Sequence, residues 1–303
     1  MLVTGATGLL GINLSLLATE LGHHVTGLAH SRRLQTTTFD LRQVDLVDRD
    51  SAMRVIENAK PEAIIHCAAI ADINLAEKNP ELTRKLNIEV PGILAEATSN
   101  WEIPLIHISS DAVFDGKKGG YIETDSPNPL SLYAKSKLDA EAMVQDKNPE
   151  ALVARVVFFG WSLSGKRSLS EFFFNHFQSG QIVQGYSDTF FSPLYVEDLA
   201  EILLEMLKLG LSGVYHVTSP KYMSKFDFGL RIAQRFGFNP SLVKPVQASS
   251  LDRGAKRSLN LSLRSEKVQK ALGYPLPSVD DGIDRLFQRW QEGYSHYLQS
   301  MAV

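Results

Sequence analysis

The sequence is poor in several features, and each shortage narrows what the protein can be. Among 303 residues there is a single cysteine, Cys67, which rules out an internal disulfide framework and is compatible with a reducing compartment. No apolar run is long enough to span a bilayer, and no signal peptide is visible. The formal net charge of -3 gives no basic footprint for nucleic acid. We therefore expect a cytoplasmic protein with neither a membrane nor a nucleic acid as partner.

What the sequence does have is a glycine-rich turn close to its first residue. Gly5, Gly8 and Gly11 follow a short apolar segment in Gly-x-x-Gly-x-x-Gly spacing. Such a turn lets backbone N–H groups approach a pyrophosphate and aims the positive end of the following helix at it. The sequence therefore predicts a dinucleotide site whose first contacts come from Gly5, Thr7, Gly8, Leu9, Leu10 and Gly11.

Apolar segments typical of buried strands alternate with segments of helical periodicity. The pattern predicts strands at residues 1–4, 25–29, 63–67, 105–109 and 152–158, and helices at 9–21, 51–59, 80–99 and 131–145. A further helix at 196–209 and a strand at 214–218 continue the alternation. The sequence therefore predicts an α/β fold built on a doubly wound parallel Rossmann sheet.

A tyrosine and a lysine lie four residues apart within the predicted helix at 131–145. Tyr133 and Lys137 therefore share one helix face, where the ammonium can hold a nicotinamide ribose and lower the phenol's pKa. A ketone that accepts hydride develops negative charge on oxygen and needs a proton donor and a hydrogen-bond donor, which Tyr133 and Ser110 can supply. Asn87 could kink the helix at 80–99 and hold a water behind Lys137, or it could be an interhelical polar contact.

The end of the second predicted strand bears on the choice of cofactor. No carboxylate follows it, whereas Arg32 and Arg33 do, and these could pair with a 2′-phosphate or form an exposed loop pair. Asp45 and Leu46 lie where a further strand, between those at 25–29 and 63–67, is expected to end, and there Asp45 could meet the adenine edge or act as a cap. We therefore predict NADP(H), with NAD(H) as a second possibility and no metal, since His66 and His107 lack metal-ligand spacing.

The regular pattern loosens after residue 160 and returns near residue 196. We expect an NADP-binding Rossmann domain at residues 1–159 and 189–218. A smaller interleaved C-terminal lobe at 160–188 and 219–303 should bind the substrate over the carboxyl ends of the strands. Arg155 stands in the middle of an apolar strand, where it could anchor a phosphate or tie down a buried carboxylate.

Several motifs together resemble an extended short-chain dehydrogenase/reductase. They are the glycine turn, the Ala68-Ala69 pair, the run Ser109-Ser110-Asp111-Ala112-Val113-Phe114-Asp115-Gly116, and Tyr133 to Lys137. Within that superfamily the chain most resembles dTDP-4-dehydrorhamnose reductases, on Ala76-Glu77, Pro80-Glu81, residues 193–200, Lys256-Arg257, Asn260, Leu263 and Lys267. The resemblance implies that Ser110 is the catalytic Ser/Thr, Tyr133 the acid/base and Lys137 the ribose-binding lysine. It also implies cofactor contacts from Ala68, Ala69 and Ser109, and a homodimer through the helices at 80–99 and 131–145.

The sequence departs from that family at the sugar end of the pocket. Ala112 stands where an aromatic residue is usual, Phe158 lies near the place of a tryptophan, and Ile70 and Asn74 replace a tyrosine and an aspartate. We expect the substrate to be lined by Asp111, Ala112, Val113, Phe158 and Phe159. The predicted function is NADPH-dependent reduction of a nucleotide-linked 4-ketosugar. The alternatives are a nucleotide-sugar epimerase that uses the same tyrosine, and a non-catalytic NADP-binding subunit resembling the regulatory subunit of methionine adenosyltransferase.

Overall fold

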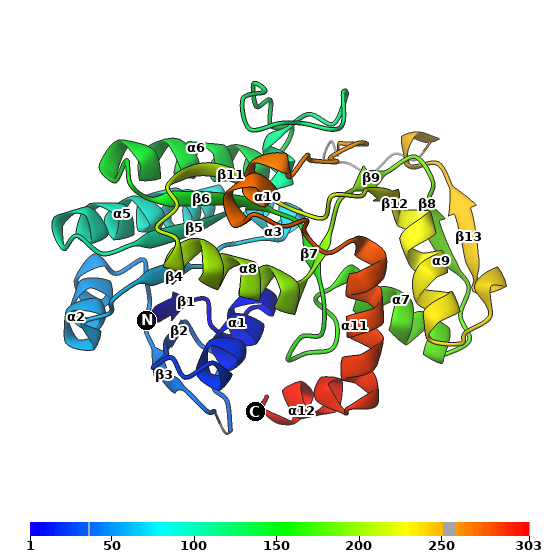
Figure 1. Cartoon of the computed structure of the whole chain (residues 1–303), viewed down its shortest axis with the longest axis horizontal. Helices are drawn as coiled ribbons and strands as arrows, with labels where there is room; N and C mark the ends of the chain where they lie inside the picture. The colour runs from blue at the N-terminus through cyan, green and yellow to red at the C-terminus, as the bar shows by residue number, and fades with distance from the viewer. Residues whose placement is uncertain (36, 251–257, 303) are drawn as a thin grey trace.

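The computed structural model describes residues 1–35, 37–250 and 258–302, and within these residues its central feature is a parallel sheet of seven strands (Figure 1). The strands lie in the order β11-β6-β5-β4-β1-β2-β3. Their bounds are β1 Leu2–Thr4, β2 Thr26–Ala29, β3 Asp40–Gln43, β4 Ile64–His66, β5 Leu105–Ser110, β6 Leu152–Val156 and β11 Gly213–Val217. All neighbouring pairs are parallel, as the alternating sequence pattern predicts.

Helices cover both faces of this sheet because its strands present apolar side chains in both directions. One face packs against α1 (Leu9–Glu20) and α8 (Val196–Lys208), and the other against α2 (Arg49–Ala59), α5 (Val90–Asn100) and α6 (Leu132–Lys147) (Figure 1). Successive residues alternate between the two cores: Val3 and Ile65 join the first, while Leu2 and Ile64 join the second. The predicted doubly wound Rossmann arrangement is thereby confirmed.

The predicted helix at 80–99 is not one continuous α-helix. It consists of α4 (Pro80–Arg84), a π-helical segment η1 (Lys85–Glu89) and α5. Pro91 has no N–H with which to bond the carbonyl of Asn87 one turn earlier, and a wider turn absorbs the mismatch. A further short helix, α3 (Ile73–Lys78), precedes α4 and was not predicted.

The smaller lobe is built from short strands and helices beside the carboxyl ends of the sheet strands. It contains β8 (Val183–Tyr186) paired with β13 (Val243–Val246), β9 (Phe190–Phe191) paired with β12 (Met223–Ser224), and the helices α7 (Leu169–Gln178) and α9 (Lys225–Arg235). Aromatic side chains fill its interior, and Phe228 contacts Phe173 and Phe191 edge to face or tilted. β7 (Phe158–Phe159) and β10 (Leu194–Tyr195) lead the chain into and out of this lobe.

The C-terminal segment contacts both parts of the molecule. It forms α10 (Glu266–Leu272), which packs on β11, α11 (Val279–Gln291), which packs on α9 and β10, and α12 (Tyr294–Ser300), whose Tyr294 hydroxyl donates to Asn13 Oδ1 of α1 at 3.0 Å (Figure 1). The predicted division into residues 1–159 with 189–218 and 160–188 with 219–303 stays a prediction. Among the described residues no helix has the length and apolar character needed to cross a membrane.

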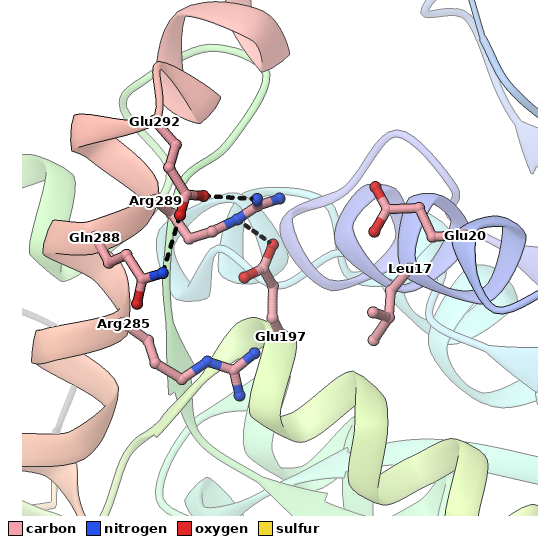
Figure 2. Close-up of a pocket in the computed structure, with 7 residues that line it drawn as sticks. All are labelled: Leu17, Glu20, Glu197, Arg285, Gln288, Arg289 and Glu292. Carbon is pink, nitrogen blue, oxygen red and sulfur yellow. Dashed lines mark hydrogen bonds and ion pairs between the residues drawn. The ribbon is translucent and has the colours of Figure 1, made fainter.

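Two arginines of α11 attach that helix to α8 of the sheet layer. Arg285 donates to the buried carboxylate of Asp198 and, at 2.9 Å, to Glu201. Arg289 lies between Glu197 and Glu292, at 3.1 Å from each, as Figure 2 shows. Both arginines line a cavity of about 260 Å³, together with Glu197, Gln288 and Glu292 and with Leu17 and Glu20 from the last turn of α1. The cavity is remote from the glycine turn, since that turn lies at the opposite end of α1.

Candidate active site

The glycine turn links β1 to α1 in a backbone conformation that other residues do not fit. Gly5 has φ of +63°, and a Cβ there would lie 2.8 Å from Ala68 Cα. A Cβ on Gly11 would lie 2.1 Å from the carbonyl oxygen of Gly5. Within the described chain no side chain caps the N-terminus of α1, whose N-cap is Gly8, so its first-turn N–H groups are open to an anion.

This turn lies at the point where the strand order reverses. β1 pairs with β2 on one side and with β4 on the other. In open parallel sheets a crevice forms at the carboxyl ends of the strands where the strand order reverses, and ligands bind there. The residues after β4 reach the same place, because the Ala68 N–H donates to Thr4 Oγ1 at 3.2 Å. The cradle of bare glycines, open N–H groups and small alanines fits a dinucleotide pyrophosphate.

Ser110, Tyr133 and Lys137 meet at the carboxyl end of β5. Ser110 is the last residue of that strand; its hydroxyl donates to Asp111 Oδ1 at 2.9 Å and accepts from the Ala112 N–H at 3.1 Å. Tyr133 is in the first turn of α6, whose N-cap Ser131 accepts from the Ala134 N–H at 3.2 Å. Burial raises the pKa of Tyr133 to about 12 against the opposing effect of a hydrogen bond with Ser110. The protein alone therefore raises the pKa of Tyr133 and does not lower it as predicted.

Lys137 is 3% exposed and is held from below by the strand layer. Its ammonium donates to the Ile108 carbonyl at 2.6 Å and lies 3.5 Å from His107 Nε2. Burial lowers the pKa of Lys137 to about 8, although the nearby Glu141 carboxylate opposes this effect. The ordinary lysine pKa is 10.5, so the pKa of Lys137 lies much nearer to neutral pH. The side chain is still mostly protonated at neutral pH, and it loses its proton as the pH rises through about 8.

Asn87 is fully buried in the π-helical segment and joins three parts of the fold. Its Oδ1 accepts from the Ile70 N–H at 2.8 Å, and its Nδ2 donates to the Ile70 carbonyl at 3.1 Å and to Ser136 Oγ at 2.9 Å. It is thus an interhelical polar contact next to the lysine on α6. Its predicted part in holding a water stays a prediction.

The residues predicted to recognise the adenosine end lie after β2 and β3. Arg32 is half-buried and Arg33 exposed, and neither forms an ion pair or hydrogen bond within the described residues. Asp45 Oδ1 accepts from the Val47 N–H at 3.0 Å, so it does close a local turn. Leu46 is buried in the sheet core, whereas Ala68 and Ala69 follow β4 and are half-buried, and the Ala68 backbone lies against Gly5 of the glycine turn.

The residues predicted to bind substrate divide between the crevice and the core. Asp111 is buried beside Ser110, and burial raises its pKa to about 6 against the opposing charge of Lys225. Val113 and Phe159 are fully buried; Phe159 packs against Tyr195 and Phe228 rather than on an accessible surface. Ala112 and Phe158 are half-buried.

Sequence reasoning missed two charged residues at this site. Lys225 begins α9 in the smaller lobe, and its charge lowers the pKa of Asp111, an effect between distant segments for which the sequence carries no signal. Glu141, four residues after Lys137 on α6, could have been found from its helical spacing alone.

The RmlD substrate binding domain family matches residues 1–292. The chain belongs to this family. It is 35% identical to the probable low-salt glycan biosynthesis reductase of Haloferax volcanii, over 94% of this chain and 96% of that protein. It is 31% identical to the methionine adenosyltransferase 2 subunit beta of Rattus norvegicus, over 89% of this chain and 81% of that protein. The crystal structure of a hypothetical dTDP-4-dehydrorhamnose reductase from Sulfolobus tokodaii has a TM-score of 0.81 and 31% identity, covering 93% of this chain and 98% of that one.

Membership of the RmlD family bears on the resemblance inferred from the sequence. The superfamily assignment is confirmed, and the relatives support an oxidoreductase. Solved structures that share the fold, at 20–24% identity, include complexes with NADP and with NAD. Of the residues that carried the resemblance, Lys256 and Arg257 lie outside the described residues, while Lys267 donates to the Val214 carbonyl at 2.6 Å.

Proposed function

We propose that this RmlD-family protein is an NADPH-dependent reductase of a nucleotide-linked 4-ketosugar. The observation that carries the proposal is the meeting of Ser110, Tyr133 and Lys137 at the end of β5, on the same edge of the sheet as the open glycine turn. The curated relative named as a glycan biosynthesis reductase supports a sugar substrate. The sugar would lie between that edge and the smaller lobe.

Each catalytic side chain has one task in this proposal. The glycine turn and the N–H groups of α1 hold the dinucleotide, which supplies the hydride when bound. Ser110 turns the hydroxyl proton that it donates to Asp111 towards the ketone oxygen, and Tyr133 delivers the proton; a phenol with a pKa of about 12 is fully protonated at neutral pH. Lys137 holds the ribose and offsets the negative charge that develops as the proton leaves.

The preference for NADPH over NADH is assigned to the loop after β2. Arg32 and Arg33 are without partners in the described residues, and guanidinium forks match a 2′-phosphate. Residues 30–39 contain no carboxylate for the ribose hydroxyls that NADH would present, and Asp45, which follows β3, closes its own turn. A cytoplasmic homodimer through α4, α5 and α6 completes the proposal.

The test is NADPH oxidation by the purified protein against a panel of nucleotide-linked 4-ketosugars. dTDP-4-dehydrorhamnose heads the panel, and NADH replaces NADPH in the control. Saturable turnover with stoichiometric loss of NADPH is the expected result. Isomerisation of a nucleotide sugar without net loss of cofactor would instead identify an epimerase.

A second function is favoured by the relatives named methionine adenosyltransferase 2 subunit beta. On this alternative the chain binds NADP and a partner enzyme without turnover. The presence of both Tyr133 and Lys137 at the crevice favours the reductase. Tight NADPH binding with no turnover across the panel, together with capture of a methionine adenosyltransferase, would favour the subunit.

A further inference from the structure

A buried ion pair lies under α6, one helical turn beyond Lys137. Glu141 on α6 is 3% exposed and Arg155 in β6 is 4% exposed. The guanidinium donates from Nε to Glu141 Oε1 at 3.0 Å and from Nη2 to Oε2 at 2.7 Å. Removing two charges from water is costly, and a buried pair often adds no net stability. Because such a pair often contributes little to stability, its position one turn from Lys137 indicates a role in the reaction.

The pair ties α6 to both strands beneath it. Glu141 also accepts a hydrogen bond from the hydroxyl of Ser109, the residue before Ser110. Ser109 and Arg155 are direct neighbours across β5 and β6. On its far side, Arg155 Nη1 lies 3.4 Å from His216 Nε2, and the Phe114 ring is 5.1 Å from its guanidinium carbon. One carboxylate thus links the helix of Tyr133 and Lys137 to the strand of Ser110.

Glu141 is also the negative charge that faces Lys137. The titratable groups that act on the ammonium are His107 on β5, His66 on β4, Cys67 directly after it, and Glu141 on α6. Tyr133 lies one turn before Lys137 on α6, and Arg155 on β6 pairs with Glu141. Burial lowers the pKa of His66 to about 3 and that of His107 well below its ordinary value, and it raises the pKa of Cys67 to about 12. These three groups, like Tyr133, are neutral at neutral pH, which leaves Glu141 as the anion among the groups named.

We propose that Glu141 and Arg155 are positioning residues for the reaction. Glu141 keeps the Lys137 side chain an ammonium ion and fixes α6 relative to Ser110, while Arg155 holds Glu141 in place and limits the strength of its charge. The inference deepens the proposed function, on which it rests for the role of Lys137. The charge relation itself exists in the protein without substrate.

The proposal is tested by two single variants that must act in opposite directions. Glu141→Gln removes the anion and leaves the guanidinium, so the pKa of Lys137 should fall by at least about one unit. Arg155→Met leaves the carboxylate without its counter-ion, so the same pKa should rise. Both are read from the pH titration of ¹³C-labelled lysine by NMR, with Lys137→Arg to assign the signal.

A purely structural role predicts a different result. Loss of packing or stability would shift the Lys137 titration in the same direction in both variants, or not at all, and either result overturns the proposal. Arg285→Met is the matched control: it leaves the buried Asp198 without its counter-ion on α8 and should lower stability without moving the Lys137 titration.

A double variant covers the case in which a single variant does not fold. Glu141→Gln with Arg155→Met leaves no unpaired charge and is expected to fold. Its Lys137 pKa should lie below that of the wild type, since the Glu141 charge raises that pKa in the wild type; an unchanged pKa would refute the proposal. Opposite shifts in a protein that reduces no ketosugar would sink the proposed function alone, and turnover without these shifts would sink this inference alone.

Discussion

Tyr133 is the residue on which the proposed chemistry depends most directly. Replacing it by Phe keeps the ring in the first turn of α6 but removes the proton that the ketone oxygen must receive. Turnover should fall about 10²–10⁴-fold, the usual contribution of general acid catalysis. The affinity for NADPH, measured by fluorescence titration, should stay within a few-fold because the glycine turn is unchanged. Turnover that survives the substitution would show that another group supplies the proton.

Arg32 and Arg33 decide the cofactor if the phosphate argument is right. The double change Arg32→Glu with Arg33→Glu should weaken NADPH by roughly 10–100-fold, since a hydrogen bond to a charged group contributes about 1.5–3 kcal/mol. NADH has no 2′-phosphate and should lose much less. Arg49→Glu with Arg54→Glu, the same change of charge at two exposed positions on α2, is the control. Equal losses for both dinucleotides would contradict the proposed phosphate contact.

The free energy of unfolding should depend on pH through Asp111, and the burial of its carboxyl group sets the direction of this dependence. Its pKa is raised from 3.8 to about 6 in the folded protein, so between these values the folded state holds a proton that the unfolded state has lost. This contribution to stability is present at low pH and is lost as the pH rises towards about 6. Asp111→Asn should therefore gain on the order of 2–3 kcal/mol relative to the wild type between about pH 4 and pH 6. Urea unfolding of both proteins across this range measures the difference in their free energies of unfolding. A difference that does not change with pH would contradict the prediction.

At the level of elements, the π-helical segment depends on Asn87. Asn87→Ala removes its bonds to Ile70 and Ser136 and leaves buried partners unsatisfied. The free energy of unfolding should fall by about 2–3 kcal/mol, against a few tenths for Asn100→Ala at the exposed end of α5. Denaturant unfolding compares the two. A loss no larger than that of Asn100→Ala would mean that Pro91 alone maintains the segment.

Elements with a local signal could be predicted from the sequence, and elements shaped by distant contacts could not. The glycine turn and the Tyr133–Lys137 spacing are local, and they led to the confirmed fold and superfamily. The break at residues 85–89 has local signals in Pro91 and in Asn87, which was expected as a possible kink, whereas the contact of Asn87 with Ile70, 17 residues away in the chain, could not be predicted. The predicted helix at 80–99 was therefore correct in place but wrong in continuity.

For the whole molecule, the site is a product of topology. β1, β4 and β5 are neighbours in the sheet although their residues come from separate stretches, so the turn at Gly5 and the hydroxyl of Ser110 share one edge. The doubly wound pattern allowed this to be predicted. The contribution of Lys225 was not predictable, because it depends on how β12 pairs with β9 in the smaller lobe.

The ion pair between Arg285 on α11 and Asp198 on α8 helps to attach α11 to the sheet layer. Removing one partner should lower the free energy of unfolding much more than removing the other. Asp198 is 1% exposed, whereas the Arg285 side chain is 37% exposed. Arg285→Met leaves a buried carboxylate without a counter-ion and should cost about 3–5 kcal/mol of unfolding free energy. Asp198→Asn leaves a guanidinium that can turn to solvent or to Glu201 and should cost much less.

Urea unfolding of both single variants and of the double variant measures this inequality. The double variant should recover most of the loss of Arg285→Met, because no unpaired charge remains buried. Binding of NADPH should survive in all three, since the pair lies on α8 and α11 rather than at the glycine turn. Equal losses in the two single variants would mean that α11 is attached by apolar packing on α9 and β10, with the ion pair contributing little.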